Sequence, residues 1–354
     1  MSSRYRAVNW NRHKIVYDLV LAGSCMFFLG VFVLVSMLFH RPPNEISTPI
    51  LVMRGLGTLA IVLLHVALAI GPVARLWPRT TFLLANRRHL GVTIFLVAGL
   101  HALVVYGFYG GFGVENPVLA VLVRPDGGVG FEFLGFLALL ILLMMAATSH
   151  DFWLAFLGHG VWKALHMAVY AAYVLVVAHI VFGVLQSERS LVYPVGLLLG
   201  GGLLGGLHIA AGIREFRSDT RSPDASDDGW IDIGDPQAIP DKRARVVCLG
   251  KGERVAVFRD GAQLTALSNV CAHQGGPLGE GQIIDGCATC PWHGYQYNAT
   301  CGQSPPPFTE RIPTYELRVR GGRVEVHASA NEPGTPTTPV TIPGLSTPSS
   351  EVQQ

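Results

Sequence analysis

The sequence predicts a multidomain membrane protein, in which a six-helix transmembrane bundle is followed by a small all-β domain. Three observations support this prediction. Of the 354 residues, 50% are hydrophobic and only 14% are charged, which is too little charge for a chain that is soluble throughout. Six apolar runs are long enough to cross a bilayer. After residue 228 the chain changes to short alternating runs separated by turns, a pattern typical of antiparallel strands.

Each apolar run is expected to form an α-helix, because backbone groups in lipid must hydrogen bond within their own segment. The first run is longer than the apolar region of a cleavable signal peptide and has no small-residue cleavage site, so we expect it to be retained. The runs cover Ile15–Phe39, Ile50–Leu76, Leu90–Tyr109, Phe131–Thr148, Val161–Leu185 and Leu191–Ile213.

Basic residues are divided unequally between the two sides of this bundle. Because Lys and Arg concentrate on the cytoplasmic side of a cell membrane, we expect a multi-pass inner-membrane protein with both termini and the β domain in the cytoplasm. One side holds Arg4, Arg6, Arg12, Lys14, Arg75, Arg79, Arg87, Arg88, Lys163, Arg214, Arg217 and Arg221, and the other holds Arg41, Arg54, Arg124 and Arg189. The net charge of +2 is too small to suggest a nucleic-acid partner.

These patterns divide the chain into five parts. The last part is rich in Pro, Thr and Ser, and we expect it to be a disordered tail. The parts are a cytoplasmic N-terminus (1–14), the helical domain (15–213), a charged linker (214–228), the β domain (229–328) and the tail (329–354).

Two cysteine–histidine motifs in the β domain are the strongest functional signal. Cys271-Ala272-His273 is followed, after sixteen residues, by Cys290-Pro291-Trp292-His293. Two thiolates on one iron and two imidazoles on the other would hold a [2Fe–2S] cluster between two loops. A structural zinc site is the alternative, but zinc sites rarely use this spacing in a β-hairpin domain.

This pattern resembles that of Rieske proteins over residues 229–328. The resemblance implies that Cys271 and Cys290 bind the inner iron, and that His273 and His293 bind the outer, more exposed iron.

The Rieske proteins of quinol-oxidising bc complexes carry two further cysteines, which form a disulfide, and a serine that bonds a sulfur of the cluster. Gly276, Trp292 and Tyr295 stand in those three places here. Fewer hydrogen bonds to the sulfurs disfavour the reduced cluster, so we expect a potential toward the low end of the Rieske range.

Histidines within the apolar runs are the second signal, because imidazoles in a bilayer are costly and usually functional. His166 and His179 are thirteen residues apart in the fifth run, or about 20 Å along a helix, which suits one b-type haem near each face. The third and fifth helices run in the same direction, so histidines at equal depth can bind one iron from opposite sides. We therefore expect His101 and His179 to hold an outer haem.

An inner haem would use His166, and its second ligand stays open. His89 has the right depth, twelve residues before His101, although its angular position is offset. His65 is the other candidate, and an interfacial basic cluster with neighbouring arginines is the competing interpretation of His89. We expect one or two haems in total.

The helices resemble the ferric-reductase-like membrane domain, which includes NADPH oxidases and the haem-binding subunit of the bacterial periplasmic methionine sulfoxide reductase system. The resemblance rests on Arg87-Arg88-His89-Leu90-Gly91, on His101, and on the histidines and tyrosines of residues 165–179. It implies b-type haem and electron transfer across the membrane.

The expected function is therefore that of an oxidoreductase component. A cytoplasmic donor, either a reductase or a ferredoxin, would pass electrons through the cluster and haem to a periplasmic acceptor such as an oxidoreductase. A membrane-anchored Rieske ferredoxin, or a metal-binding interaction module without haem, is the alternative. A fused bc-complex subunit is disfavoured because the β domain is predicted to be cytoplasmic and lacks the disulfide cysteines.

Overall fold

The computed structural model describes residues 12–39, 46–109, 116, 130–187, 190–220, 226, 228–249, 253–292 and 294–345. The chain divides into two compact units. The first comprises Met1–Gly71 and Asn86–His208 and is helical, whereas the second comprises Pro72–Ala85 and Ile209–Gln354 and contains the β domain.

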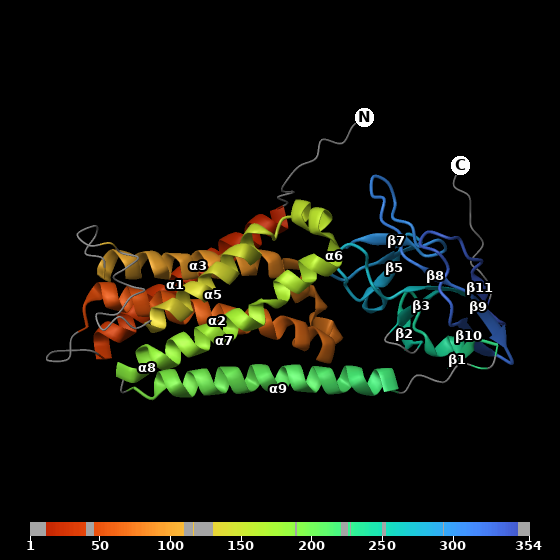
Figure 1. Cartoon of the computed structure of the whole chain (residues 1–354). Helices are drawn as coiled ribbons and strands as arrows, with labels where there is room; N and C mark the ends of the chain where they lie inside the picture. Colours follow the sequence, from red (N-terminus) through yellow and green to blue (C-terminus); the bar gives the residue numbers. More distant parts are fainter. Residues whose placement is uncertain are drawn as a thin grey trace. The chain divides into compact units, whose positions relative to one another are not determined.

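Long apolar helices make up most of the first unit (Figure 1). Five stretches of the described residues are long and apolar enough to cross a membrane, and a sixth helix, α5, is apolar but only 17 residues long. The expected membrane bundle is thus confirmed, and the expected number of six spanning helices is approximate. The helices are α1 Arg12–Phe39, α2 Thr48–Leu76, η1 Pro78–Asn86, α3 Arg87–Tyr109, α5 Phe131–Ala147, α6 Asp151–Met167, α7 Val169–Phe182, α8 Val184–Ser187 and α9 Val192–Thr220.

The fifth apolar run, expected as one helix over Val161–Leu185, lies within one candidate span, Gly160–Ser187, which includes the end of α6 and all of α7 and α8. α6 begins earlier and bends at Gly158, whose φ of 74° is a conformation that glycine adopts readily because it has no Cβ. α6 and α7 meet at Ala168, whose backbone stays in the right-handed helical region. His166 and His179 therefore lie on two consecutive helices, and α5 packs beside α7 and α3.

The β domain consists of short antiparallel strands, which confirms the expected fold class. In the described residues, β1–β10–β9 form one sheet, β11–β4–β3–β2 with β8 form a second, and β5–β6–β7 form a third. The strands are β1 Trp230–Gly234, β2 Ala244–Cys248, β3 Arg254–Asp260, β4 Gln263–Ser268, β5 Gln282–Ile284, β6 Cys287–Thr289, β7 Gln296–Asn298, β8 Thr314–Tyr315, β9 Leu317–Arg320, β10 Arg323–His327 and β11 Val340–Thr341, with short 3-10 turns η2 Pro236–Ala238 and η3 Leu278–Glu280.

Two hydrophobic cores support this domain. The larger core lies under the first two sheets, and alternate residues of β1 and β10 point into it, as the period of a strand requires. The second core contains Cys271, Cys290 and Tyr297 together with Phe258 of β3. The cysteine motifs are thus part of a packed core.

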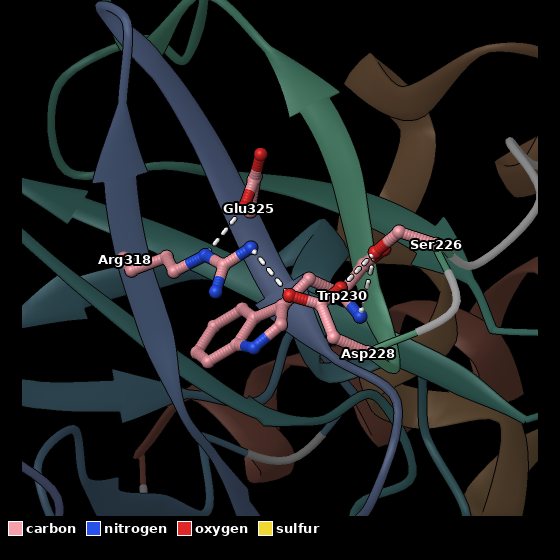
Figure 2. A network of polar contacts seen from close by, with 5 residues as sticks. All are labelled: Ser226, Asp228, Trp230, Arg318 and Glu325. Atoms are coloured by element: carbon pink, nitrogen blue, oxygen red, sulfur yellow. Dashed lines mark hydrogen bonds and ion pairs between the residues drawn. The ribbon is translucent and has the colours of Figure 1, made fainter.

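A polar network fastens the entry of the β domain to the β9–β10 hairpin (Figure 2). The guanidinium of Arg318 lies 4.2 Å from the centre of the Trp230 ring and donates to Glu325 at 2.5 Å and to Asp228 at 3.2 Å. The N–H of Ser226 donates to the carbonyl of Trp230 at 2.8 Å. Because Arg318 contacts both the incoming chain and β10, it ties the first strand to the hairpin beside it.

The boundaries of the linker and the tail differ from those expected. α9 continues to Thr220, so the first residues of the expected linker are helical. The expectation of a disordered tail from residue 329 was wrong for residues 340–342, because β11 pairs with β4 and Ile342 is 1% exposed in the larger core. Composition alone missed this strand, since only two residues pair and Pro and Thr surround them.

We expect Ile342→Ala to destabilise the β domain by about 2–5 kcal/mol, because it leaves a cavity in a well-packed core. Ile284→Ala is the matched control, since this isoleucine is 37% exposed, and it should cost only about 0.5 kcal/mol. Pulse proteolysis of the full-length protein across a urea series measures both effects. Equal urea midpoints for the two variants would contradict the placement of Ile342 in the core.

Candidate redox centres

The two cysteine motifs lie in loops that fold in the same way. In the first loop, which follows β4, Gly275 N–H donates to the Cys271 carbonyl at 2.7 Å, and Cys271 N–H donates to the Gly276 carbonyl at 2.9 Å. In the second loop, between β6 and β7, Gly294 and Tyr295 make the corresponding bonds with Cys290 at 2.9 and 2.8 Å. Each loop therefore presents its cysteine from the same turn.

A glycine with positive φ closes each turn. The φ of Gly275 is 69° and that of Gly294 is 70°, a region that L side chains rarely adopt. Each glycine is the fourth residue after its cysteine, so the repeated C-x-x-x-G spacing has a backbone cause.

The two thiols meet inside the second core. Cys271 is 1% exposed and Cys290 is 2% exposed. A hydrogen bond with the Cys290 thiol, aided by Tyr297, lowers the pKa of Cys271 to about 6 in spite of burial. The thiolate is the form that binds metals, so this pair has the chemistry of metal ligands.

His273 is held from the side by aromatic rings. Its ring stacks on Tyr295 with centroids 4.9 Å apart and planes 7° from parallel. The Tyr295 hydroxyl donates to Glu310, and Phe308 packs against the Tyr295 ring at 5.0 Å. His293 lies outside the described residues.

In the helical unit, the structure brings His101 of α3 and His179 of α7 together. Their ring centroids are 6.4 Å apart and the ring planes are nearly perpendicular, at 83°. Both rings donate from Nδ1 to a backbone carbonyl of another segment at 2.9 Å, His101 to Met53 and His179 to Phe131. With Nδ1 protonated, Nε2 carries the lone pair that can bind a metal.

Each imidazole lies against a glycine, and this glycine follows by one helical turn the residue whose carbonyl the imidazole bonds. A Cβ on Gly57 would lie 3.3 Å from the His101 ring, and a Cβ on Gly135 would lie 2.9 Å from the His179 ring. Met53 precedes Gly57 by four residues, and Phe131 precedes Gly135 by four. The same arrangement, a carbonyl followed by a glycine on one helix face, therefore receives each histidine.

The other candidate histidines of the membrane part are placed differently. His166 stacks on Trp162 at 3.8 Å and donates from Nδ1 to the Trp162 carbonyl, and its buried Nε2 has no hydrogen-bond partner in the part of the chain that the structure describes. The Nε2 of His65 meets the Tyr173 hydroxyl at 3.0 Å. His89 bonds the carboxylate of Asp18.

Comparison with known proteins divides the chain in the same way. The family model of the ferric reductase like transmembrane component matches residues 56–177, and that of the Rieske [2Fe-2S] domain matches residues 229–316. The protein-methionine-sulfoxide reductase heme-binding subunit MsrQ of Rhodospirillum rubrum is 32% identical over 165 residues, which are 47% of this chain and 75% of that protein. The chain belongs to the ferric-reductase-like membrane proteins and carries a C-terminal Rieske domain.

Two further relatives agree with this division. MsrQ of Caulobacter vibrioides is 36% identical over 128 residues, 36% of this chain and 57% of the relative. The anthranilate 1,2-dioxygenase ferredoxin subunit of Burkholderia cepacia is 38% identical over 74 residues, 21% of this chain and 68% of the relative. A solved complex of oxygenase and ferredoxin of carbazole 1,9a-dioxygenase has 25% identity and a TM-score of 0.28, covering 30% of this chain and 98% of that one.

A ferric-reductase-like membrane part joined to a Rieske domain indicates electron transfer. The donor set of the Rieske domain fits a [2Fe–2S] cluster, because two buried thiols meet beside a histidine whose ring is held in place. The individual ligand assignments, Cys271, His273, Cys290 and His293, remain predictions, as do the haem ligands.

Trp292 lies against Gly276, and these are the two positions at which the sequence analysis places the disulfide cysteines of bc-complex Rieske proteins. A Cβ on Gly276 would lie 2.7 Å from the Cys290 Sγ and 3.1 Å from the Trp292 ring. The two loops are therefore in direct contact where the bc proteins have two cysteines. In this structure a Cβ at position 276 would therefore require the Cys290 side chain or the loop to shift.

The sequence analysis missed Tyr297, which contacts the Cys271 sulfur through its hydroxyl at 3.4 Å. Tyr297 is fully buried, and burial followed by the negative charge of Cys271 raises its pKa, so it keeps its proton and can donate. Strand alternation in β7 was the available signal, because Tyr297 points inward between two residues that are more exposed.

Tyr297→Phe should lower the cluster potential by some tens of millivolts. It removes one hydrogen bond to a sulfur, worth about 1 kcal/mol, and about 59 mV correspond to tenfold in a one-electron equilibrium. Redox titration of the Rieske electron paramagnetic resonance signal measures the shift. Tyr315→Phe is the control, because Tyr315 is equally buried but its hydroxyl bonds Glu253 in the other core. An equal shift in both variants would show that the sulfur contact is not the cause.

Proposed function

We propose that this protein carries electrons across a membrane. A cytoplasmic donor would reduce the Rieske domain, the membrane histidines would hold b-type haem, and an acceptor on the far side would receive the electrons. When bound, a [2Fe–2S] cluster or a haem iron takes up and releases one electron. The chain's own residues hold these groups, orient the ligands and exclude water.

The pairing of His101 with His179 is the observation that supports haem most directly. Two iron–nitrogen bonds of about 2 Å, together with roughly 1 Å from each Nε2 to its ring centre, add to about 6 Å. The ring centroids lie 6.4 Å apart. Both Nδ1 atoms are bonded to carbonyls, the usual outer contact of a metal-binding histidine. These two histidines would hold the outer haem.

The names of the relatives support the same proposal. MsrQ is named as a heme-binding subunit of a methionine sulfoxide reductase, and the ferredoxin relative is named as a subunit of a dioxygenase. By analogy, we propose that the acceptor is a periplasmic oxidoreductase and that the donor is a separate reductase or ferredoxin. The excess of basic residues beside the termini supports a cytoplasmic Rieske domain.

A membrane-anchored Rieske ferredoxin without haem is the competing function. It would need the helices only as an anchor, and it gives no reason for two imidazoles to meet within a bilayer, each with its Nδ1 bonded to a carbonyl. An absorption spectrum of the purified protein separates the two functions.

We expect His101→Ala and His179→Ala each to remove the outer haem and its low-spin bis-histidine spectrum, because one iron loses a ligand. The Rieske signal should stay intact, since its ligands lie in the other unit. His208→Ala is the control, because the His208 ring bonds Tyr170 and is not an assigned ligand.

Two glycine variants test the geometry of the same site. Gly135→Ala forces the His179 ring to move and should alter or remove the haem spectrum, whereas Gly99→Ala has nothing within 4 Å of the new Cβ and should not. Unchanged haem content in His101→Ala, His179→Ala and Gly135→Ala would contradict the proposed pair.

The proposed route predicts that reducing the Rieske domain also reduces haem. Sealed vesicles with the Rieske domain outward, given an impermeant reductant, should show haem reduction in the wild type and a large loss of its rate in His293→Ala. Equal rates in both would show that electrons bypass the Rieske domain. His327→Ala is a control within the same domain, because His327 packs on Trp230 at the entry network.

A further inference from the structure

Asp18 is an acidic side chain within the first candidate membrane span, Lys14–Phe39. A carboxylate at such a position is costly and usually has a function. Its two oxygens lie 2.8 and 3.0 Å from Nδ1 of His89 in α3, and the Tyr17 ring stands edge-on to the same imidazole at 6.3 Å. The side chains are about a quarter exposed, at 22% for His89 and 26% for Asp18.

His89 differs from the other intramembrane histidines in the acceptor that its Nδ1 meets. Five of them, all in the described helices, place Nδ1 against a backbone carbonyl at 2.8–3.0 Å: His65, His101, His166, His179 and His208. A carbonyl is neutral, whereas the Asp18 carboxylate carries a full negative charge. The contact also joins α1, which lies outside the residues matched by the ferric-reductase model, to α3.

Two observations place His89 at the same end of the bundle as His166. His89 precedes His101 by twelve residues, which is about 18 Å along α3. The charges of the neighbouring Arg88 and Arg87 act on His166, so the start of α3 and His166 lie at the same end of the bundle. Among the described residues the Nε2 of His166 is buried and unpaired, while the backbone of Met145 lies close to the ring.

We propose, building on the function above, that Asp18 is a positioning residue for His89 as an inner-haem ligand, and that its charge sets the inner haem at a lower potential than the outer one. The carboxylate accepts the Nδ1 proton, leaves the Nε2 lone pair for iron and makes the imidazole a stronger donor. A stronger donor and a nearby negative charge both favour ferric over ferrous iron. His101 and His179 receive no such charge from their carbonyls.

This difference in potential gives electron transfer between the two sites a direction. His89 would hold the inner haem and His101 with His179 the outer one, and the two groups would supply one-electron transfer that needs no proton or other reactant. Because the inner site has the lower potential, the transfer is downhill from the His89 end toward the His101 end. The polarity of the route would therefore come from one residue of α1.

The test is a spectroelectrochemical titration of the full-length protein with its haems bound. Wild type should show two haem potentials. In Asp18→Asn, which keeps the size but removes the charge, the lower potential should shift upward while the higher one stays in place. Asp18→Glu should return the lower potential toward the wild-type value. Ser24→Ala is the control on the same helix, since Ser24 bonds only its own helix at Val20, and it should change neither potential.

Each result decides the proposal. Loss of one haem in Asp18→Asn with recovery in Asp18→Glu also supports it, because positioning then depends on the carboxylate. Unchanged potentials at full haem content, or an equal shift of both, would overturn it. A single haem that is lost in His101→Ala would overturn it while leaving the proposed function intact, whereas wild-type protein with no haem at all would refute the proposed function itself.

Discussion

An imidazole inside a membrane must find an acceptor for its N–H within the protein, because lipid offers none. This requirement organises the helical unit. His101 and His179 reach across to carbonyls of other segments, and in both cases a glycine one turn further along lets the ring come close. Satisfying Nδ1 decides the tautomer, and this tautomer leaves the lone pair on Nε2, the ring atom that could then bind a metal. The need to satisfy Nδ1 therefore explains both where the glycines lie and which tautomer the histidines adopt.

In the Rieske domain the two cysteine loops adopt the same backbone turn. Both loops use a glycine at positive φ four residues after the cysteine, so both thiols arrive in the core from equivalent backbone. The thiols are buried, whereas His273 is partly exposed and stacks on Tyr295, which in turn contacts the exposed Phe308. The two thiols therefore lie deeper in the domain than the imidazole of His273.

Local patterns predicted much of this organisation. The apolar runs, the alternating strands and the two cysteine motifs each depend on neighbours in sequence, and the structure has the helices, the β domain and the paired loops. What the sequence could not predict depends on packing between distant segments. The strand at residues 340–341 falls in this class, as do the contact of Tyr297 with a sulfur and the bond between Asp18 and His89. In each case the partner lies far along the chain, and a local period can show at most that a side chain points inward, not which residue it meets.

The contact of Trp292 with Gly276 has a consequence for where such a domain can work. A disulfide between two loops is lost wherever thiol reductants keep cysteines reduced, as in the cytosol. A tryptophan packed on a glycine contains no bond that a reductant can break. The contact between the loops therefore does not depend on the redox conditions of the compartment in which the domain lies.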